Sequence, residues 1–308
     1  MRRITVVGSL NMDLVVNTPR IPVLGETILG SDFFTAPGGK GANQAVAAAK
    51  LGGSVLMVGC VGNDIFGKEL LENLSKNNVD VENVKLIDKT PTGITMITVK
   101  DGDNFIIVDP GANSKLLPVM IESIEELIKE SFIAVIQLEI PFETVEKTIN
   151  LAKKHGTKVL LNPAPARKIP DELFKKIDII TPNEKECEFL TGIPINSIDD
   201  AKTALHILRK SGISQVIITM GSEGVVYNNE ETALHKPAYD VKPVDTTAAG
   251  DSFTGALAVA LSEGKSIDDA VDFANIVGAL TVTKSGAQKS LPSKKDVDGF
   301  IRRHKTLL

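Results

Sequence analysis

Cysteine and long apolar runs are both scarce in this sequence of 308 residues. Its two cysteines, Cys60 and Cys187, are too few for a disulfide framework or a cysteine-based metal site, so we expect ordinary thiols in a reducing compartment. The first apolar run, residues 4–7, is too short for a signal peptide or a membrane span. These absences predict a soluble, cytoplasmic protein with no membrane partner.

The chain also lacks an excess of positive charge. It has 34 lysines and arginines against 39 aspartates and glutamates, which gives a net charge of −5. Such a balance provides no electrostatic attraction to nucleic acid or to an anionic membrane. We therefore expect no nucleic acid partner, and any phosphate group that the protein binds must be held by local geometry.

Predicted strands and helices alternate along most of the chain, without an internal repeat or a low-complexity linker. Regular alternation indicates an α/β fold, with a parallel sheet covered by helices on both faces. The length predicts one large domain, or one domain with a small accessory unit. Strands are expected at 4–7, 55–61, 133–138, 158–161, 177–181 and 216–219, and helices at 44–51, 66–77, 117–129, 142–154, 184–190, 198–210, 252–263, 267–284 and 294–303.

Four short strands do not fit this alternation, and we assign them to a small accessory sheet at 13–17, 29–35, 93–99 and 104–108. The last two form a predicted hairpin, because an Asp-Gly turn lies between them. Such a sheet can close over a site as a lid, and its open edges and apolar face could be covered by a second subunit. The predicted division is a main domain of 1–12, 37–92 and 109–308 and a discontinuous lid of 13–36 and 93–108.

A run of small residues with a carboxylate, Asp245-Thr246-Thr247-Ala248-Ala249-Gly250-Asp251, precedes the apolar segment 253–261. A helix beginning near Ala249 would direct unpaired amides and the positive end of its dipole at an anion. Asp251, in the first turn, could then accept a proton from a substrate hydroxyl while the amides hold a phosphoryl group. On these residues alone, an acid that only stabilises the first turn of a helix remains the alternative.

A second glycine-rich segment, Gly38-Gly39-Lys40-Gly41-Ala42-Asn43, precedes an alanine-rich helix. It is not a Walker A loop, because Lys40 is followed by glycine, and it does not match GxGxxG. Polar residues also follow several predicted strands, at the edge where open α/β sheets bind ligands. The alternative for Asn11 and Asp13 is a solvated strand edge. Each of the others is singly explained as a cap or a turn residue; they are Glu139, Asn162, Asn183 and Glu186, together with the glycine turn 220–224.

The two glycine motifs, with Asn183-x-x-Glu186 between them, resemble the signatures of the ribokinase/PfkB carbohydrate kinase family. The resemblance extends from Ile4 to about Phe300. It implies a ribokinase-like fold, in which a central, mostly parallel sheet is flanked by helices on both faces and carries a small inserted β-sheet lid.

The resemblance also implies a role for each matched residue. Asp251 would be the catalytic base, and the amides of Ala248, Ala249, Gly250 and Asp251 would form an anion hole for the transferred phosphoryl group. The sugar would be bound by Asn11, Asp13, Gly39, Lys40, Gly41, Ala42, Asn43, Glu139 and Asp251. ATP would be bound by Asn183, Thr219, Gly221, Ser222, Glu223, Gly224, Gly250 and Asn275.

Two cations are implied in the same way. Magnesium (Mg²⁺) and phosphate belong to the motif of Asn183 and Glu186. Potassium (K⁺), an activator that does not touch the substrate, would be held mostly by main-chain carbonyls, at Asp245, Thr247, Thr281, Lys284, Gly286 and Ser290.

The activity that this resemblance implies is the ATP-dependent phosphorylation of D-ribose at its 5-hydroxyl, which gives D-ribose 5-phosphate and ADP. The protein is expected to be a homodimer joined through its lid sheets. The match over the whole sugar set favours ribose, and a kinase of another sugar or nucleoside in the same family is the alternative. A sugar-binding protein without activity is a third hypothesis, which the intact Asp251 and glycine segments disfavour.

Overall fold

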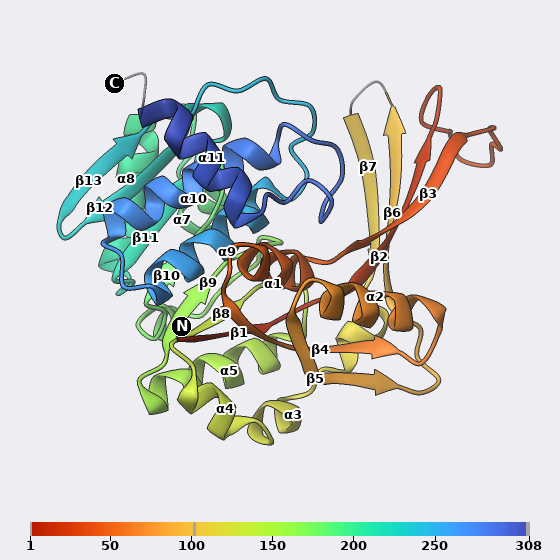
Figure 1. The fold of residues 1–308 in the computed structure, drawn as a ribbon, viewed down its shortest axis with the longest axis horizontal. Helices are drawn as coiled ribbons and strands as arrows, with labels where there is room; N and C mark the ends of the chain where they lie inside the picture. Colours follow the sequence, from red (N-terminus) through yellow and green to blue (C-terminus); the bar gives the residue numbers. More distant parts are fainter. Residues whose placement is uncertain (1, 101–102, 306–308) are drawn as a thin grey trace.

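The computed structural model describes residues 2–100 and 103–305. Its strands form two separate sheets, a main sheet of nine strands and a small sheet of four strands that stands at one end of the molecule (Figure 1). Within the described residues, the helices are too short or too polar to cross a membrane. The predicted fold class, an α/β fold with a small additional sheet, is confirmed.

The main sheet has the strand order β13-β12-β11-β10-β9-β8-β1-β4-β5. All neighbours from β5 to β11 are parallel, and β12 and β13 are added as antiparallel strands at one edge. The strands are β1 Arg3–Val7, β4 Ser54–Gly62, β5 Val79–Ile87, β8 Ile133–Ile136, β9 Lys158–Leu161, β10 Ile179–Ile180, β11 Gln215–Thr219, β12 Val225–Asn229 and β13 Thr232–Lys236.

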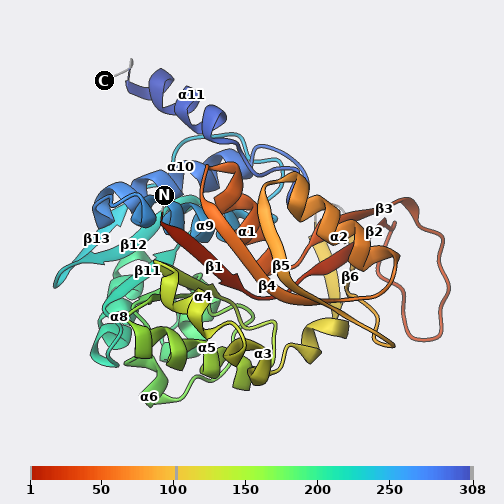
Figure 2. The same cartoon turned by 60° about the horizontal axis from the view of Figure 1, so that its bottom comes forward.

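Helices cover both faces of the main sheet (Figures 1 and 2). Alternate residues of a strand enter opposite cores: in β8, Ile133 and Val135 pack in one, and Ala134 and Ile136 in the other. The first face carries α1 Lys40–Lys50, α2 Ile65–Lys76, α9 Ala249–Ser262, α10 Ile267–Thr281 and α11 Lys294–Lys305. The second carries α3 Pro118–Glu122, α4 Glu125–Glu130, α5 Phe142–His155, α6 Asp171–Phe174, α7 Glu184–Thr191 and α8 Ile198–Lys210, and two 3₁₀ turns, η1 Gly111–Lys115 and η2 Gly221–Glu223, connect elements.

Two helices differ from the sequence prediction in an informative way. The helix expected at 117–129 is split into α3 and α4, because the chain leaves helical geometry at Ile124. Helix α1 begins at Lys40 instead of residue 44. Its first turn follows directly on Gly39, whose φ of 88° suits glycine and whose Cβ would lie 2.7 Å from the Asn11 amide. The Gly-Lys-Gly-Ala-Asn segment is therefore mostly the beginning of a helix and not a loop.

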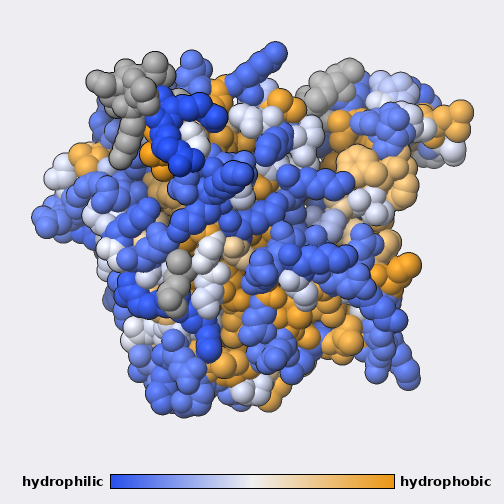
Figure 3. All heavy atoms as spheres, viewed as in Figure 1, coloured by the Kyte–Doolittle hydropathy of each residue, from blue (hydrophilic) through white to orange (hydrophobic). Residues whose placement is uncertain are grey.

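The small sheet consists of β3 Ser31–Gly38, β2 Asn11–Asn17, β6 Gly93–Lys100 and β7 Asp103–Asp109, in that order. Its central pair, β2 and β6, is parallel, and both outer pairs are antiparallel. Hydrophobic side chains gather on it, at the right of the space-filling view (Figure 3). The exposed ones on its strands are Phe33, Phe34, Met96, Phe105, Ile106, Ile107 and Val108.

Candidate active site

Helix α9 begins at the predicted phosphoryl-binding motif. Its N-cap residue, Ala248, has a φ of 61°, a left-handed conformation that is costly for a residue with a Cβ, and no side chain caps the helix. The Ala249 amide donates to the Thr246 carbonyl over 3.2 Å, whereas the hydrogen bonds described for this turn leave the amides of Gly250 and Asp251 without a partner. Gly250 faces open space, with no heavy atom within 4 Å of the place of a Cβ. The turn can therefore receive an anion.

Asp251 is buried under this turn, and its two carboxylate oxygens are bound by different side chains of α1. Asn43 Nδ2 donates to Oδ2 over 2.9 Å, and Gln44 Nε2 donates to Oδ1 over 2.9 Å. Both donors lie more than 200 residues away in sequence, and the close packing of α1 against α9 brings them to Asp251. The carboxylate is thus held at the junction of the first and last parts of the chain.

The predicted sugar residues converge on this carboxylate from three elements: Asn11 and Asp13 from β2, residues 39–43 from the start of α1, and Glu139 from the segment after β8. Glu139 Oε2 accepts hydrogen bonds from Ser9 Oγ over 2.6 Å and from the Lys40 amide over 3.2 Å. Asn11 Oδ1 accepts one from Asn113 Nδ2 over 2.7 Å. Hydroxyl-binding groups therefore line the strand ends next to Asp251.

Charge is concentrated at the same place. Burial disfavours the charge of the Lys40 ammonium, but nearby carboxylates outweigh burial and raise its pKa; they are Asp251, Glu139, Glu186 and Asp13. Burial raises the pKa of Asp13 to about 6, aided by Glu139 and Asp251 and opposed by Thr95 and Lys40. One ammonium thus balances several carboxylates in a site that is shielded from water.

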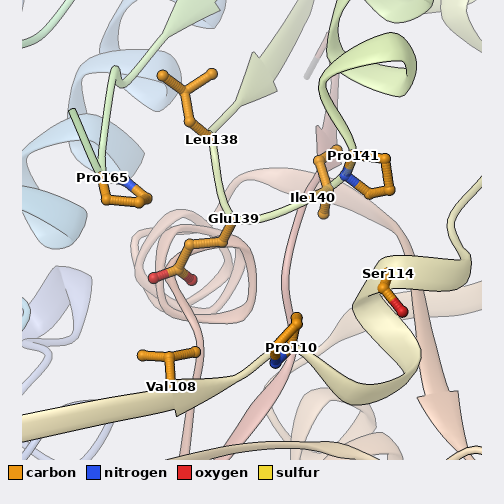
Figure 4. Close-up of a pocket in the computed structure, with 8 residues that line it drawn as sticks. All are labelled: Val108, Pro110, Ser114, Leu138, Glu139, Ile140, Pro141 and Pro165. Carbon is orange, nitrogen blue, oxygen red and sulfur yellow. The ribbon is translucent and has the colours of Figure 1, made fainter. Parts of the chain in front are cut away.

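A cavity of about 400 Å³ adjoins Glu139, between the end of β7, η1 and the segments that follow β8 and β9 (Figure 4). Figure 4 shows the Glu139 carboxylate above Val108 of β7, with Pro165 on the opposite side from Pro141. Its walls are otherwise mostly apolar, and its lining consists of Val108, Pro110, Ser114, Leu138, Glu139, Ile140, Pro141 and Pro165. A strand of the small sheet therefore forms one wall of a hollow beside the predicted sugar residues.

The predicted nucleotide residues lie along the carboxyl ends of β10 and β11. Asn183 pairs with Thr219 as an isolated parallel bridge, and Asn183 and Glu186 form a reciprocal cap of α7. Burial raises the pKa of the Glu186 carboxyl. Residues 221–223 form an exposed turn, and Asn275 donates to the Pro237 carbonyl over 2.8 Å, beside Gly224. The structure brings these residues to one edge of the sheet.

The predicted potassium residues lie in two loops, before α9 and after α10. Asp245 joins the loops, since its carboxylate accepts from the Thr247 amide over 2.9 Å and from the Gly286 amide over 2.8 Å. These hydrogen bonds outweigh the effect of burial and lower the pKa of Asp245. Thr281, at the end of α10, donates to Ser252 Oγ over 2.9 Å. Lys284 and Ser290 lie in the second loop, and the hydrogen bonds described for Ser290 stay within that loop.

Comparison with protein families agrees with these motifs. The model of the pfkB family carbohydrate kinases matches residues 1–294. The chain belongs to the PfkB family. Among the relatives of this PfkB kinase, a ribokinase of Lactococcus lactis is 45% identical over 303 residues, which cover 98% of both chains. A deoxyribokinase of Salmonella typhi is 38% identical over 300 residues, 97% of this chain and 98% of that one.

A solved structure extends the likeness to three dimensions. Arabidopsis thaliana ribokinase complexed with ribose and ATP matches with a TM-score of 0.91 and 36% identity, covering 96% of this chain and 97% of that one. The predicted family resemblance is therefore confirmed in sequence and in fold.

This PfkB kinase also contains buried polar residues that the sequence motifs did not single out. Gln44 contacts Asp251 directly, Gln137 contacts Gln44, and Gln288 donates to Asn43 Oδ1 over 3.1 Å. Two of them could have been found from their place in the sequence, because Gln44 follows the first glycine motif and Gln137 lies two residues before Glu139. Gln288 had no comparable signal, since only the folded structure brings the loop before α11 to α1.

Proposed function

We propose that this protein transfers the γ-phosphoryl group of ATP to the 5-hydroxyl of D-ribose. The observation that carries this function is the position of Asp251, a buried carboxylate that lies below an open helix N-terminus and beside a cluster of hydroxyl-binding side chains. The near full-length similarity to ribokinases supports the choice of sugar.

The chemistry assigns each group one task. The ribose O5 attacks the γ-phosphorus, its proton passes to Asp251, and the bond from the γ-phosphorus to the oxygen bridging to the β-phosphorus breaks. D-ribose 5-phosphate and ADP result. Because phosphoryl transfer depends mostly on alignment and on stabilisation of negative charge, the amides of the anion hole and the sugar contacts account for most of the catalysis. The small sheet closes over the sugar as a lid and excludes water.

Magnesium would enter this site with ATP. Within the described part of the chain, histidine, cysteine, aspartate and glutamate side chains form no group of three that could hold a metal ion. That arrangement fits Mg²⁺, which nucleotide-binding sites usually hold through phosphates and water with only one or two carboxylates. Glu186 is the carboxylate available, while Asn183 fixes its position. When bound, the ion would offset the negative charge of the phosphates.

A potassium site at the two loops joined by Asp245 also fits the residues present. The candidate ligand atoms there are oxygens, namely the Asp245 carboxylate and main-chain carbonyls. Thr247 lies in the first loop, Thr281 at the end of α10, and Lys284, Gly286 and Ser290 in the second loop. Oxygen atoms are the ligands that hard cations prefer. A bound K⁺ would add positive charge near the start of α9 and would order the loop that carries the anion hole.

We further propose a cytoplasmic homodimer, in which the small sheets of two subunits cover each other. The support is the exposed apolar surface of that sheet. We also propose a main domain of 1–12, 37–92 and 109–308 and a lid of 13–36 and 93–108, which the separation of the strands into two sheets supports.

The test is ADP release from ATP and Mg²⁺ in the presence of ribose, with and without K⁺. We expect ribose-dependent turnover that K⁺ increases. Asp251→Asn should lose turnover by about 10² or more while still binding ribose, because proton transfer to the carboxylate is removed and the sugar contacts remain. Ribose binding without turnover in the unsubstituted protein would contradict the proposal.

The alternative sugar is 2-deoxyribose, since a deoxyribokinase is among the relatives. A site that hydrogen-bonds a hydroxyl rejects the analogue that lacks it, because its polar groups are left unpaired. The same assay with 2-deoxyribose, fructose and adenosine therefore decides the substrate. A higher kcat/KM for any of these than for ribose would assign that substrate instead.

A further inference from the structure

A chain of buried amide side chains runs behind Asp251 and ties it to the ends of three strands of the main sheet. Gln44 Nε2 donates both to Asp251 Oδ1 over 2.9 Å and to Asn162 Oδ1 over 3.0 Å. Asn162 Nδ2 donates to the Thr181 carbonyl over 2.9 Å, and Gln137 Nε2 donates to Gln44 Oε1 over 2.6 Å. Each of these side chains is at least nine-tenths buried.

The direction of every amide in this chain follows from the main-chain carbonyl at its end. The Thr181 carbonyl can only accept, so Asn162 must turn its NH₂ group to Thr181 and its oxygen to Gln44. Gln44 then needs both N–H groups for the two acceptors, Asn162 Oδ1 and Asp251 Oδ1, and its own oxygen is left to face Gln137. Gln137 must in turn present its NH₂ group.

This arrangement leaves one hydrogen-bonding group of Gln137, the last amide in the series, without a partner. Gln137 Oε1 is buried and has no hydrogen-bond partner, one of two such side-chain atoms among the described residues. A buried acceptor without a donor is destabilising, and turning the amide over would place its oxygen against the oxygen of Gln44. The fold therefore keeps an unsatisfied oxygen at Gln137 and a fully bonded amide at Gln44.

We propose that Gln44 is a positioning residue for the catalytic carboxylate, an inference that rests on the proposed role of Asp251. Gln44 occupies Oδ1 permanently, because all of its own hydrogen-bonding groups are used in one orientation. Asn43 Nδ2 donates to Oδ2 in the same way, so the two amides fix the carboxylate and its remaining lone pairs are left to accept the substrate proton. Gln44 is fully buried and so touches no substrate itself.

The inference concerns the ionised carboxylate, so the charges around it matter. Lys40 of α1 is the cation that acts on Asp251, and Asp13 of β2 and Glu186 of α7 are the anions. Glu139 acts on Lys40 and Asp13 from the segment after β8. Replacing Gln44 leaves all of these charged groups in place. It removes the neutral donor to Oδ1, together with the partner of Asn162 Oδ1 and of Gln137 Nε2.

The test is Gln44→Met, which keeps the approximate shape of the side chain and removes both donors. With ¹³C-carboxyl-labelled aspartate, and Asp251→Asn to assign the signal, the Asp251 carboxyl should titrate about one unit or more higher in pH than in the unsubstituted protein, because the carboxylate loses a hydrogen bond. Per ribose-binding site, kcat should fall by about tenfold or more, with KM for ribose changed less than about threefold.

Gln215→Met is the matched control. Gln215, at the start of β11, donates its side-chain amide to the carbonyl of Asn228 on β12 and has no hydrogen bond to Asp251 among those described. It should leave both the Asp251 titration and kcat unchanged. If Gln44→Met does not fold, Gln137→Met takes its place: it leaves Gln44 present but unanchored, and a smaller shift in the same direction is expected.

An unchanged titration of Asp251 in a folded Gln44→Met protein would overturn the inference, even if kcat falls, because a purely structural role would lower kcat without moving the titration. The titration needs no turnover. If the unsubstituted protein fails to phosphorylate ribose, the proposed function is wrong, and the carboxyl signal still decides whether Gln44 holds Asp251.

Discussion

Asp13 is a buried carboxylate whose charge is disfavoured by its surroundings. Burial raises its pKa from 3.8 to about 6, so the folded protein binds this proton more tightly than the unfolded chain does. The stabilisation from the protonated form is complete below the unfolded value and is lost as the pH rises from about 4 to about 6. At neutral pH the protein therefore keeps a charged group that weakens the fold.

Asp13→Asn should raise the melting temperature at pH 7.5 by a few degrees, because the buried charge is removed, and the gain should vanish below about pH 4. KM for ribose should rise by about tenfold or more, since a carboxylate that accepts from sugar hydroxyls is lost. Thermal unfolding across this pH range and steady-state kinetics measure both effects. Equal stability of the two proteins at every pH would contradict the burial argument.

Those residues of the site that lie within a motif of the family could be predicted from the sequence. Asp251, Asn43 and Glu139 were singled out in this way, and the structure brings all three together. Gln44 and Gln137 were not, because a glutamine in a predicted helix or near the end of a predicted strand is usually a surface residue. Only the packing of α1 on α9 shows that the Gln44 amide is enclosed and fully bonded.

Helices α1 and α9 approach each other closely at Gly255. A Cβ at this position would lie 2.7 Å from the Gln44 carbonyl oxygen and 2.9 Å from the Ala47 Cβ, so there is no space for a side chain. Only glycine at residue 255 therefore lets α9, which carries Asp251, pack this closely on α1, which carries its hydrogen-bond donors.

Gly255→Ala should destabilise the protein by about 1–3 kcal/mol, because the new methyl group forces the two helices apart, and it should lower kcat by disturbing the contacts to Asp251. Gly278→Ala, in α10, is the control: its Cβ would meet one atom at 3.9 Å, and alanine favours a helix interior. Urea unfolding and steady-state kinetics compare the two variants. Equal stability of Gly255→Ala and Gly278→Ala would show that the two helices have room for a side chain at residue 255.

Among the strands of the main sheet, the buried apolar ones at its centre were predicted best from the sequence pattern. β1 and β8 are apolar over most of their length. β1 begins one residue before the predicted 4–7, and β8 ends two residues before the end of the predicted 133–138. β5, at one edge of the main sheet, mixes buried and exposed residues, β13, at the other edge, has only half-buried and exposed ones, and both were missed. β12, which is mostly buried and pairs with β13, was missed as well. An edge strand has one unpaired side and partial solvent contact, so its composition resembles that of a loop.

At the level of the whole molecule, the small sheet presents a surface that a monomer would leave in water. Its outer strands, β3 and β7, have unpaired edges, and the Phe105 side chain is 51% exposed. The proposed homodimer would bury this surface and cover the edges.

We expect sedimentation velocity to show a dimer, and Phe105→Asp to shift it toward monomer, because a charge would be buried in the interface. Phe189→Asp is the matched control, since Phe189 lies on α7 and is also 51% exposed. It should leave the sedimentation coefficient unchanged. A monomeric unsubstituted protein, or equal effects of the two substitutions, would contradict an interface at the small sheet.

The pairing of α1 with α9 has a consequence for the protein during its synthesis. A nascent chain that has emerged as far as residue 240 contains both sheets and every predicted sugar contact except Asp251. It lacks α9, α10 and α11, so one face of its main sheet is covered only by α1 and α2. Contacts of such long sequence separation form late in folding. Helix α9 both completes this core and carries Asp251, so a chain that ends before α9 lacks part of its core and the proposed catalytic base.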